Sequence, residues 1–256
     1  MNAMYALERH HKIIELARAD GRVDVAASAA LFDVSGETIR RDLTTLERRG
    51  LLRRVHGGAI PVDRIAIEPT LADRERSYLA EKERIANAAI LELDDAATVL
   101  IDAGTTTARF AALLPHDREL TVVTHALPVA SALAGRPNLA LHLIGGIVRG
   151  RTLAAVGPWA NRELEDLQAD IAFLGTNGVS TERGLTTPDV TEAAVKEAIV
   201  AAARRVVVIA DHSKVGRDEF VSFAPIDAVD TLITDSDVDD ELATEIETAG
   251  VQVIRA

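Results

Sequence analysis

Three large apolar residues, Ile39, Leu43 and Leu46, recur at the i, i+4 and i+7 spacing that places side chains on one face of a helix. Ser35 is a good N-cap before this stripe, and Gly50 after it tolerates the left-handed conformation in which helices often end. The pattern therefore predicts a helix between Ser35 and Gly50 with one narrow apolar side. The opposite side of this helix is polar and carries Glu37, Arg41, Thr44 and Arg48.

The residues before this helix predict two supporting helices. Asp24 can cap a short helix over residues 25–32, and a two-residue turn joins that helix to Ser35. Apolar positions between residues 5 and 19 predict an earlier packing helix. A short helix, a tight turn and a second helix form the spacing of a helix-turn-helix, whose second helix enters the major groove of DNA.

The residues after Gly50 predict a basic hairpin. Residues 51–55 alternate as a short strand and residues 56–58 can turn it back, which is typical of a wing that contacts phosphates. Arginine on the outer face of a three-helix bundle can be solvated charge alone, but the unbroken order of these elements favours DNA binding. The residues expected to contact DNA are Ser35, Glu37, Thr38, Arg40, Arg41, Thr44, Arg48, Arg53, Arg54 and His56.

The pattern changes after Pro61 to Pro69, a segment without a sustained period that predicts a linker. Beyond it, helical patterns alternate with short apolar runs, which is typical of a largely parallel sheet covered on both faces. We expect an α/β protein with a winged helix-turn-helix at 1–60, a linker at 61–70 and a mostly parallel domain at 71–256. The expected strands are 98–101, 120–124, 139–144, 171–175, 205–209, 231–234 and 251–254, and the expected helices are 72–91, 106–114, 127–134, 158–167, 189–203 and 239–249.

Composition changes this picture in two ways. The chain has no cysteine, no run of about 18 apolar residues and no basic-then-apolar leader, so we expect a cytoplasmic protein without disulfides or a membrane anchor. The formal net charge of -12 is unevenly spread, because residues 1–60 hold 10 basic and 8 acidic residues, a net charge of +2. This split fits a basic DNA-binding module joined to an acidic body.

Polar residues follow the expected strands, and parallel sheets bind ligands at the carboxyl ends of their strands. Residues 102–107 form a turn of small residues that opens a helix, where N–H groups, threonine hydroxyls and the helix dipole can hold a phosphate. The turn lacks the Gly-Lys-Ser/Thr ending of a nucleotide-binding loop. Arg149, Lys196 and Lys214 can add positive charge, and Asp102 and Asp211 can accept hydrogen bonds from sugar hydroxyls, so a phosphorylated polyol is the expected ligand. Taken singly, each residue also has a structural explanation; Lys196, for example, can pair with Glu192 on its own helix.

The motifs of both parts resemble those of the DeoR family of bacterial transcriptional regulators. The matching segments are 32–35, 38–43, 50–52, 56–59, 102–107, 144–149, 173–178, 184–187, 192–196 and 211–214. The resemblance runs from about Leu7 to Asp235. It implies a sensor fold like that of ribose-5-phosphate isomerase, binding a phosphorylated sugar that relieves repression. His125 departs from the asparagine of many relatives, at a position expected to face the sugar. The implied effector-binding residues are Asp102, Gly104, Thr105, Thr106, Thr107, Thr124, His125, Gly145, Gly146, Arg149, Asn177, Gly178, Lys196, Asp211 and Lys214.

Two functions fit these features. The first is a repressor of a carbohydrate uptake or catabolism operon that binds double-stranded DNA as a homo-oligomer, a dimer or tetramer, without a cofactor or metal. The second is a sugar-phosphate isomerase-like enzyme with a DNA-binding appendage, in which Asp102, Glu192 or Asp211 serves as the base. The sequence shows no paired acid and base at a spacing typical of a catalytic site, which favours the repressor. The sequence leaves open the effector, the operator and any activating role.

Overall fold

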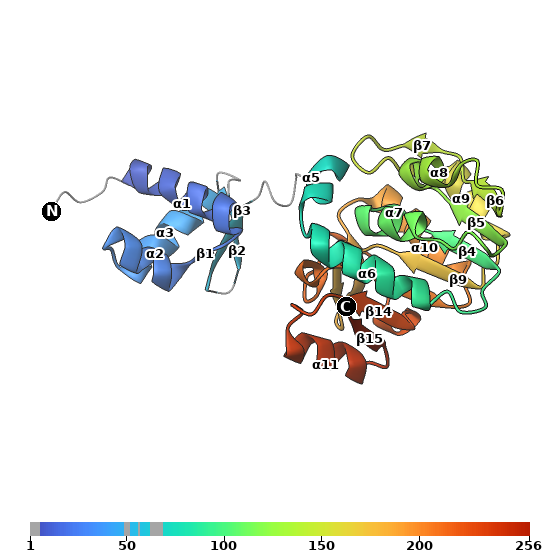
Figure 1. The fold of residues 1–256 in the computed structure, drawn as a ribbon. Coiled ribbons are helices and arrows are strands. Elements are labelled where there is room, and N and C mark those ends of the chain that lie inside the picture. Colours follow the sequence, from blue (N-terminus) through green and yellow to red (C-terminus); the bar gives the residue numbers. More distant parts are fainter. Residues whose placement is uncertain (1–5, 49–51, 56, 62–68) are drawn as a thin grey trace. The chain divides into compact units, whose positions relative to one another are not determined.

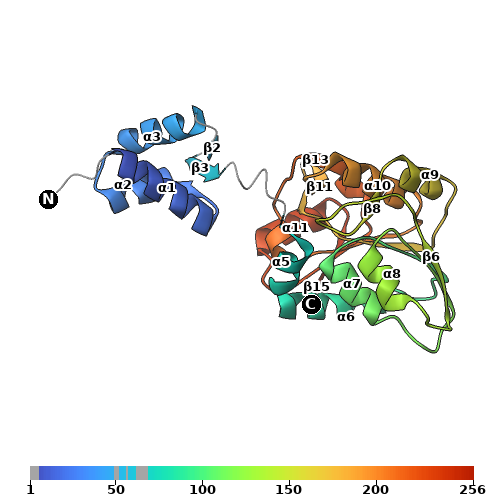
Figure 2. The same ribbon diagram turned by 90° about the horizontal axis from the view of Figure 1, so that it is seen from above.

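The computed structural model describes residues 6–48, 52–55, 57–61 and 69–256. The chain divides into two compact units, Met1–Glu68 and Pro69–Ala256 (Figures 1 and 2). Within the described part, no helix combines the length and apolar character needed to cross a membrane.

The first unit is a three-helix bundle with a small antiparallel sheet. Asp24 caps the second helix through hydrogen bonds from the backbone N–H groups of Ala26 and Ala27, and Asp33 ends it in the left-handed conformation. The predicted helix-turn-helix and hairpin are confirmed. The elements are α1 (Ala6–Asp20), β1 (Val23–Asp24), α2 (Val25–Phe32), α3 (Gly36–Arg48), β2 (Leu52–Val55) and β3 (Gly58–Pro61).

The core of the first unit contains the predicted apolar stripe, since Ile39, Leu43 and Leu46 are all buried. A buried ion pair joins two of its helices: the Arg9 guanidinium of α1 lies 2.6 Å from the carboxylate of Asp42 on α3. Charge-assisted hydrogen bonds of this kind are stronger than neutral ones, so the pair helps to hold α1 against α3.

The second unit is built on a seven-stranded, fully parallel sheet in the order β15-β14-β12-β9-β4-β5-β6. The order shows that the chain adds β5 and β6 on one side of β4 and then adds β9 on its other side. The predicted parallel α/β architecture is confirmed. Its strands are β4 (Thr98–Ile101), β5 (Leu120–Thr124), β6 (Leu139–Leu143), β9 (Ile171–Leu174), β12 (Val206–Ile209), β14 (Thr231–Thr234) and β15 (Gln252–Arg255).

Helices cover both faces of this sheet, and each face has its own apolar core (Figure 1). One face packs on α6 (Leu79–Leu91), α7 (Thr105–Ala112) and α8 (Leu127–Leu133). The other packs on α9 (Pro158–Glu165), α10 (Val190–Ala201) and α11 (Asp240–Thr248). Because both faces are buried, the central strands are continuous apolar runs such as Ile171–Leu174.

Two small antiparallel sheets were not predicted. One consists of β10 (Gly178–Ser180), β11 (Gly184–Thr187) and β13 (Val221–Ala224). The other is the hairpin of β7 (Ile147–Val148) and β8 (Ala155–Val156). These strands are only two to four residues long, which is too short for the sustained apolar pattern that marks the main sheet.

The single helix predicted over residues 72–91 is wrong. The structure has α5 (Leu71–Arg76) and α6, separated by Tyr78 in the left-handed conformation with φ of 53°. The Lys82 ammonium donates hydrogen bonds to the backbone carbonyls of Arg74 and Ser77 and so satisfies the end of α5. This contact within the chain ends one helix and begins the next, although the helical pattern of the sequence continues.

Candidate functional site

The recognition helix α3 exposes the polar face that its sequence predicts. The hydroxyl of Ser35 accepts a hydrogen bond from the N–H of Thr38 at 3.1 Å, so Ser35 is the N-cap. Glu37, Arg40 and Arg41 are exposed along the helix.

The hairpin brings a further arginine to this face. The Arg54 side chain of β2 donates to the Thr44 hydroxyl at 3.2 Å, and its backbone N–H donates to the Glu47 carboxylate. The outer face of α3 and this side of the hairpin therefore form one surface. Gly50 and His56, and the side chains of Arg48 and Arg53, lie outside the described residues.

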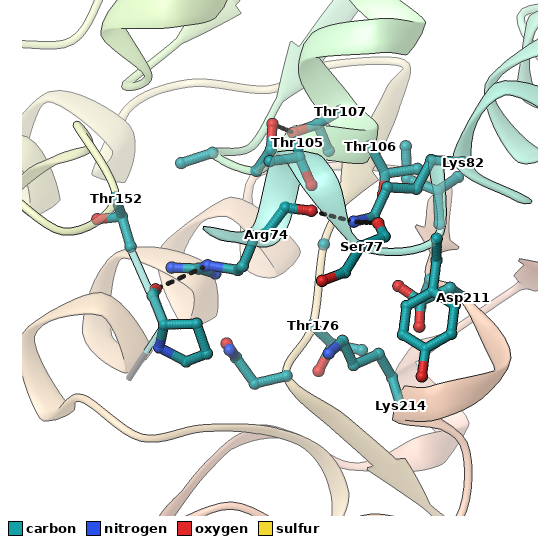
Figure 3. Close-up of a pocket in the computed structure, with 18 of the residues that line it drawn as sticks. Arg74, Ser77, Lys82, Thr105, Thr106, Thr107, Thr152, Thr176, Asp211 and Lys214 are labelled. Carbon is teal, nitrogen blue, oxygen red and sulfur yellow. Dashed lines mark hydrogen bonds between the residues drawn. The ribbon is translucent and has the colours of Figure 1, made fainter. Parts of the chain in front are cut away.

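A cavity of about 410 Å³ opens at the carboxyl ends of β4, β9 and β12, which are neighbours in the sheet (Figure 3). The strand order reverses between β4 and β9, since β5 and β6 extend the sheet on one side of β4 and β9 and β12 extend it on the other. The crevice at such a reversal is where open parallel sheets bind their ligands. The topology alone therefore makes this cavity the candidate ligand site.

Positive charge is concentrated on the cavity wall. The chain has only four lysines, and three of them, Lys82, Lys196 and Lys214, line the cavity. Arg74 and Arg217 add two further cations, against the three carboxylates of Asp73, Glu192 and Asp211. The excess of positive charge suits an anionic ligand.

The lysines differ in how they are held. Lys196 donates to the Asp102 carboxylate and the Gly175 carbonyl, while Nζ of Lys214 forms no hydrogen bond or ion pair with a described residue. Burial lowers the pKa of Lys82 and of Lys214 below the ordinary 10.5, although Asp211 acts against it in both cases. An anion beside Lys214 would restore the charged form that burial disfavours.

The N-terminus of α7 forms another wall. Gly104 precedes the helix with φ of 158°, and Thr105, Thr106 and Thr107 make its first turn and line the cavity. The first N–H groups of a helix have no intrahelical acceptor, and the dipole adds partial positive charge there. In Figure 3 the three threonines lie at the top of the cavity and Lys214 at the bottom, with Arg74 between them in this view.

Asp102 anchors the strand ends beneath this wall. It is fully buried, and its carboxylate accepts hydrogen bonds from the Gly175 N–H at 2.9 Å and from the Lys196 ammonium, while Nε2 of His125 lies 2.9 Å away. Burial alone would raise the pKa of Asp102, but Lys196 and His125 outweigh it and lower this pKa to about 2. Asp102 is thus a permanent anion that joins β4, β5, β9 and α10.

Comparison with known proteins gives the family. The model described as a DeoR-like helix-turn-helix domain matches residues 9–64, and the DeoR C terminal sensor domain matches residues 77–236. The HTH-type transcriptional regulator GlpR of Haloferax volcanii is 43% identical over 98% of each chain. The chain belongs to the DeoR family of transcriptional regulators. The glycerol-3-phosphate regulon repressor of Escherichia coli (strain K12) is 34% identical, over 91% of this chain and 92% of its own.

A likeness to solved structures is weaker. Ribose 5-phosphate isomerase A from Methanocaldococcus jannaschii aligns with 54% of this chain and 55% of its own, at 18% identity and a TM-score of 0.39. A score this low carries no argument about function. The two family models, by contrast, match one segment in each unit of the chain.

Some of the effector-binding residues predicted from the sequence line the cavity of this DeoR-family sensor, and others do not. The predicted residues that line it are Gly104, Thr105, Thr106, Thr107, Asn177, Lys196, Asp211 and Lys214. The predicted residues that do not line it are Asp102, Thr124, His125, Gly145, Gly146, Arg149 and Gly178.

The residues of the second group other than glycine are buried or already paired. His125 is buried, with Nδ1 2.9 Å from the Ala155 carbonyl oxygen, and so does not face the cavity as expected. The Thr124 hydroxyl donates to the Ile101 carbonyl, and Arg149 forms ion pairs with Asp189 and Glu192. These residues shape the strand ends behind the wall.

Sequence reasoning missed several lining residues. Arg74, Ser77, Tyr78 and Lys82 come from the segment predicted as one helix, and Thr152, Thr176, Ser213 and Arg217 from loops. One signal was available for Lys82, because lysine is rare in this arginine-rich chain and its other sensor lysines had already been assigned to the site. Thr176 and Ser213 lie inside the matching motifs 173–178 and 211–214, whereas the sequence holds no comparable signal for Thr152 and Arg217.

Proposed function

We propose that the protein is a DNA-binding transcriptional repressor of genes for carbohydrate uptake or catabolism, released from its operator by a phosphorylated sugar or polyol. It acts in the cytoplasm, where chromosomal DNA lies. A related protein named glycerol-3-phosphate regulon repressor supports this choice of ligand class. The cavity supports it independently, with cations, a helix N-terminus and threonine hydroxyls for a phosphate, and carboxylates for sugar hydroxyls.

The observation that carries the proposal is the position of α5. Pro69, Leu71, Arg74, Ser77 and Tyr78 line the cavity, and this segment directly follows the residues that join the two units. A ligand in the cavity therefore contacts the part of the sensor nearest in sequence to the DNA-binding unit. Differential contact of this kind is what a ligand needs to shift an equilibrium between binding and released states.

The α5 segment lies on the surface of the second unit. None of its residues is buried; the Leu71 N–H donates to the Arg151 carbonyl, Thr70 and Asp73 form a capping box, and Lys82 binds the final carbonyls. A short element held this way can shift at small cost when a phosphate competes for Arg74 or Lys82.

The enzyme alternative has less support. The Asp102 carboxylate is occupied by Lys196 and His125, Glu192 by Arg149 and Thr152, and Asp211 by Ser213. A carboxylate that acts as general base must lie within hydrogen-bond reach of the substrate proton. We therefore expect no isomerisation of ribose 5-phosphate by the purified protein.

The operator is double-stranded DNA with paired half-sites. Each chain has one recognition helix, and regulators of this kind bind as two-fold oligomers whose symmetry matches that of the site. We propose a homo-oligomer, a dimer or tetramer, as the active form.

The test combines ligand screening with operator release. Thermal-shift screening of the full-length protein against glycerol 3-phosphate, sugar phosphates and their unphosphorylated counterparts identifies the effector, because a ligand of the native state raises apparent stability. The hit is then titrated into a fluorescent complex with DNA selected from a random pool. Release by the phosphorylated compound alone is the expected result. Binding without any change in DNA affinity would contradict the proposal.

A further inference from the structure

The ring of His125, the residue that follows β5, is buried beside the wall of the cavity. Nδ1 lies 2.9 Å from the Ala155 carbonyl oxygen, and Nε2 lies 2.9 Å from Oδ1 of Asp102. The backbone N–H of Ala103, a residue of the cavity wall, donates to the same Nε2 at 3.2 Å. Two acceptors and one donor therefore compete for the two ring nitrogens.

No single protonation state of this ring satisfies all three partners. The Ala155 carbonyl and the Asp102 carboxylate only accept, so each needs a proton on the nitrogen that faces it. With both protons the ring is an imidazolium, and Nε2 no longer accepts the Ala103 N–H. With a proton on Nδ1 alone, Nε2 accepts the Ala103 N–H but turns its lone pair toward Asp102. One proton therefore decides whether Nε2 binds Asp102 or Ala103.

The charges around the ring are few and mostly compensated. Burial opposes it, but Lys196 and His125 lower the pKa of Asp102 to about 2, so this carboxylate keeps its charge near neutral pH. Lys196 of α10 balances that charge, and the next charged groups, Glu192 of α10 and Arg149 after β7, pair with each other. β5, α8 and the first turn of α7 contain no charged residue. A proton on the ring therefore gives this buried cluster a net positive charge.

We propose that His125 is a positioning residue of the cavity wall, whose protonation strengthens anion binding by freeing the Ala103 N–H and by adding a positive charge behind the turn at 102–107. Once Nε2 carries a proton, two donors face each other, so the Ala103 peptide turns its N–H to another acceptor. Gly104, the next residue, allows this turn of the backbone. An oxygen of an anion in the cavity is such an acceptor, beside the N-terminus of α7.

The two parts of this proposal can be tested separately. The effect on a ligand rests on the function proposed above, because it requires an anion in the cavity. The exchange of partners at Nε2 requires no ligand, since His125, Asp102 and Ala103 already lie within hydrogen-bond distance of one another.

The ligand-free test is a pH titration of the 15N-labelled full-length protein followed by NMR. In wild type, the Nε2 signal of His125 and the amide signal of Ala103 should change with a common midpoint over the range in which histidines titrate. In His125→Asn, whose side-chain amide does not titrate, the Ala103 signal should stay constant. His142→Asn is the matched control, because it removes an exposed histidine of β6 and should behave as wild type.

The ligand test uses inorganic sulfate, which remains a dianion over this pH range and so does not titrate itself. Wild type should bind sulfate about five-fold or more tightly at about pH 6 than at about pH 8, because a buried positive charge near the wall favours an anion. The pH dependence should be smaller in His125→Asn. Lys214, whose lowered pKa acts in the same direction, is present in both proteins, so the difference between them measures His125.

Each outcome decides one part of the proposal. An Ala103 amide that does not titrate in wild type, or that titrates equally in His125→Asn, would overturn the exchange at Nε2. Equal pH dependence of sulfate binding in the two proteins would overturn the effect on the ligand. Sulfate that perturbs no cavity residue at any pH would contradict the proposed function instead, and the ligand-free titration would still decide the role of His125.

Discussion

At the scale of single residues, Lys214 is a cavity cation available to a ligand, because its ammonium forms no hydrogen bond or ion pair with a described residue. Losing a charge-assisted hydrogen bond costs roughly 1.5–3 kcal/mol. We therefore predict that Lys214→Ala raises the effector concentration needed for half release by about ten-fold or more. Titration of effector into a fluorescent operator complex measures this midpoint.

Operator affinity without effector separates the possible roles of Lys214. It should remain unchanged in Lys214→Ala, as in the control Arg204→Ala, which removes an exposed cation outside the cavity. Equal release midpoints for wild type and Lys214→Ala would remove Lys214 from the site. Weaker operator binding in the uninduced state would assign it a structural role.

The lowered pKa of Lys214 predicts a pH dependence of effector binding. The ammonium loses its proton at a pH below the ordinary 10.5, so affinity for a phosphate should fall as pH rises through that lowered pKa. On the acid side, affinity should fall below about pH 6, where the phosphate gains its second proton. Lys214→Arg keeps its charge at all these pH values, and calorimetric titration should show it losing less affinity at high pH. Parallel alkaline profiles for the two proteins would contradict the assignment.

The residue scale also shows the limit of sequence reasoning. The sequence names both Asp102 and Lys196 as candidate ligand-binding residues, but their pairing across 94 positions is a long-range contact that no local pattern encodes. The same contact keeps Asp102 buried, so a residue expected to touch the ligand instead supports the wall. Thr105 to Thr107 and Lys214 were predictable because strand-end position alone placed them at the cavity.

At the scale of elements, α3 and the β2–β3 hairpin have separable roles on DNA. Arg41 is exposed on the recognition helix, so Arg41→Ala should relax sequence preference at a cost of about 1–3 kcal/mol. Arg54 extends from β2 toward the edge of that face, so Arg54→Ala should weaken all sequences alike and reduce the salt slope by about one unit. Anisotropy with operator and scrambled duplexes over a range of salt measures both effects.

The opposite pattern would revise the placement of these two arginines. If Arg41→Ala keeps full discrimination between the duplexes, Arg41 does not contact bases. If Arg54→Ala leaves the salt slope unchanged, the hairpin does not neutralise a phosphate. Arg204→Ala is again the control, because it removes one positive charge at a position distant in sequence from the DNA-binding unit.

Elements with a strong period were predictable from sequence, and elements defined by tertiary contacts were not. The apolar runs of the parallel sheet and the cap Asp24 gave boundaries close to those observed, and the helices expected to start at 189 and 239 begin one residue later, with Asp189 and Asp239 as their N-caps. The break between α5 and α6 depends on Lys82 binding the carbonyls of the preceding turn. That break places α5 on the cavity wall, where the proposed release mechanism requires it.

At the scale of the whole molecule, the two units have separate cores and opposite charge. Residues 1–60 carry a net charge of +2 and the remaining chain a net charge of -14, and the cores of the two units contain different residues. All residues that line the cavity belong to Pro69–Ala256. Ligand binding should therefore not require the DNA-binding unit.

We predict that residues 69–256 fold alone and bind the effector of the full-length protein with an affinity within about three-fold of it, a difference of roughly 0.7 kcal/mol. Starting at Pro69 keeps Thr70, whose capping box with Asp73 begins α5, and keeps the Pro69 carbonyl that accepts from Arg74. Calorimetric titration of both proteins measures the affinities. A matched fragment that starts at Leu79 lacks α5 and should fold but bind more weakly. Equal affinity of the two fragments would show that α5 does not contact the ligand, and the link between the cavity and the DNA-binding unit would have to lie elsewhere.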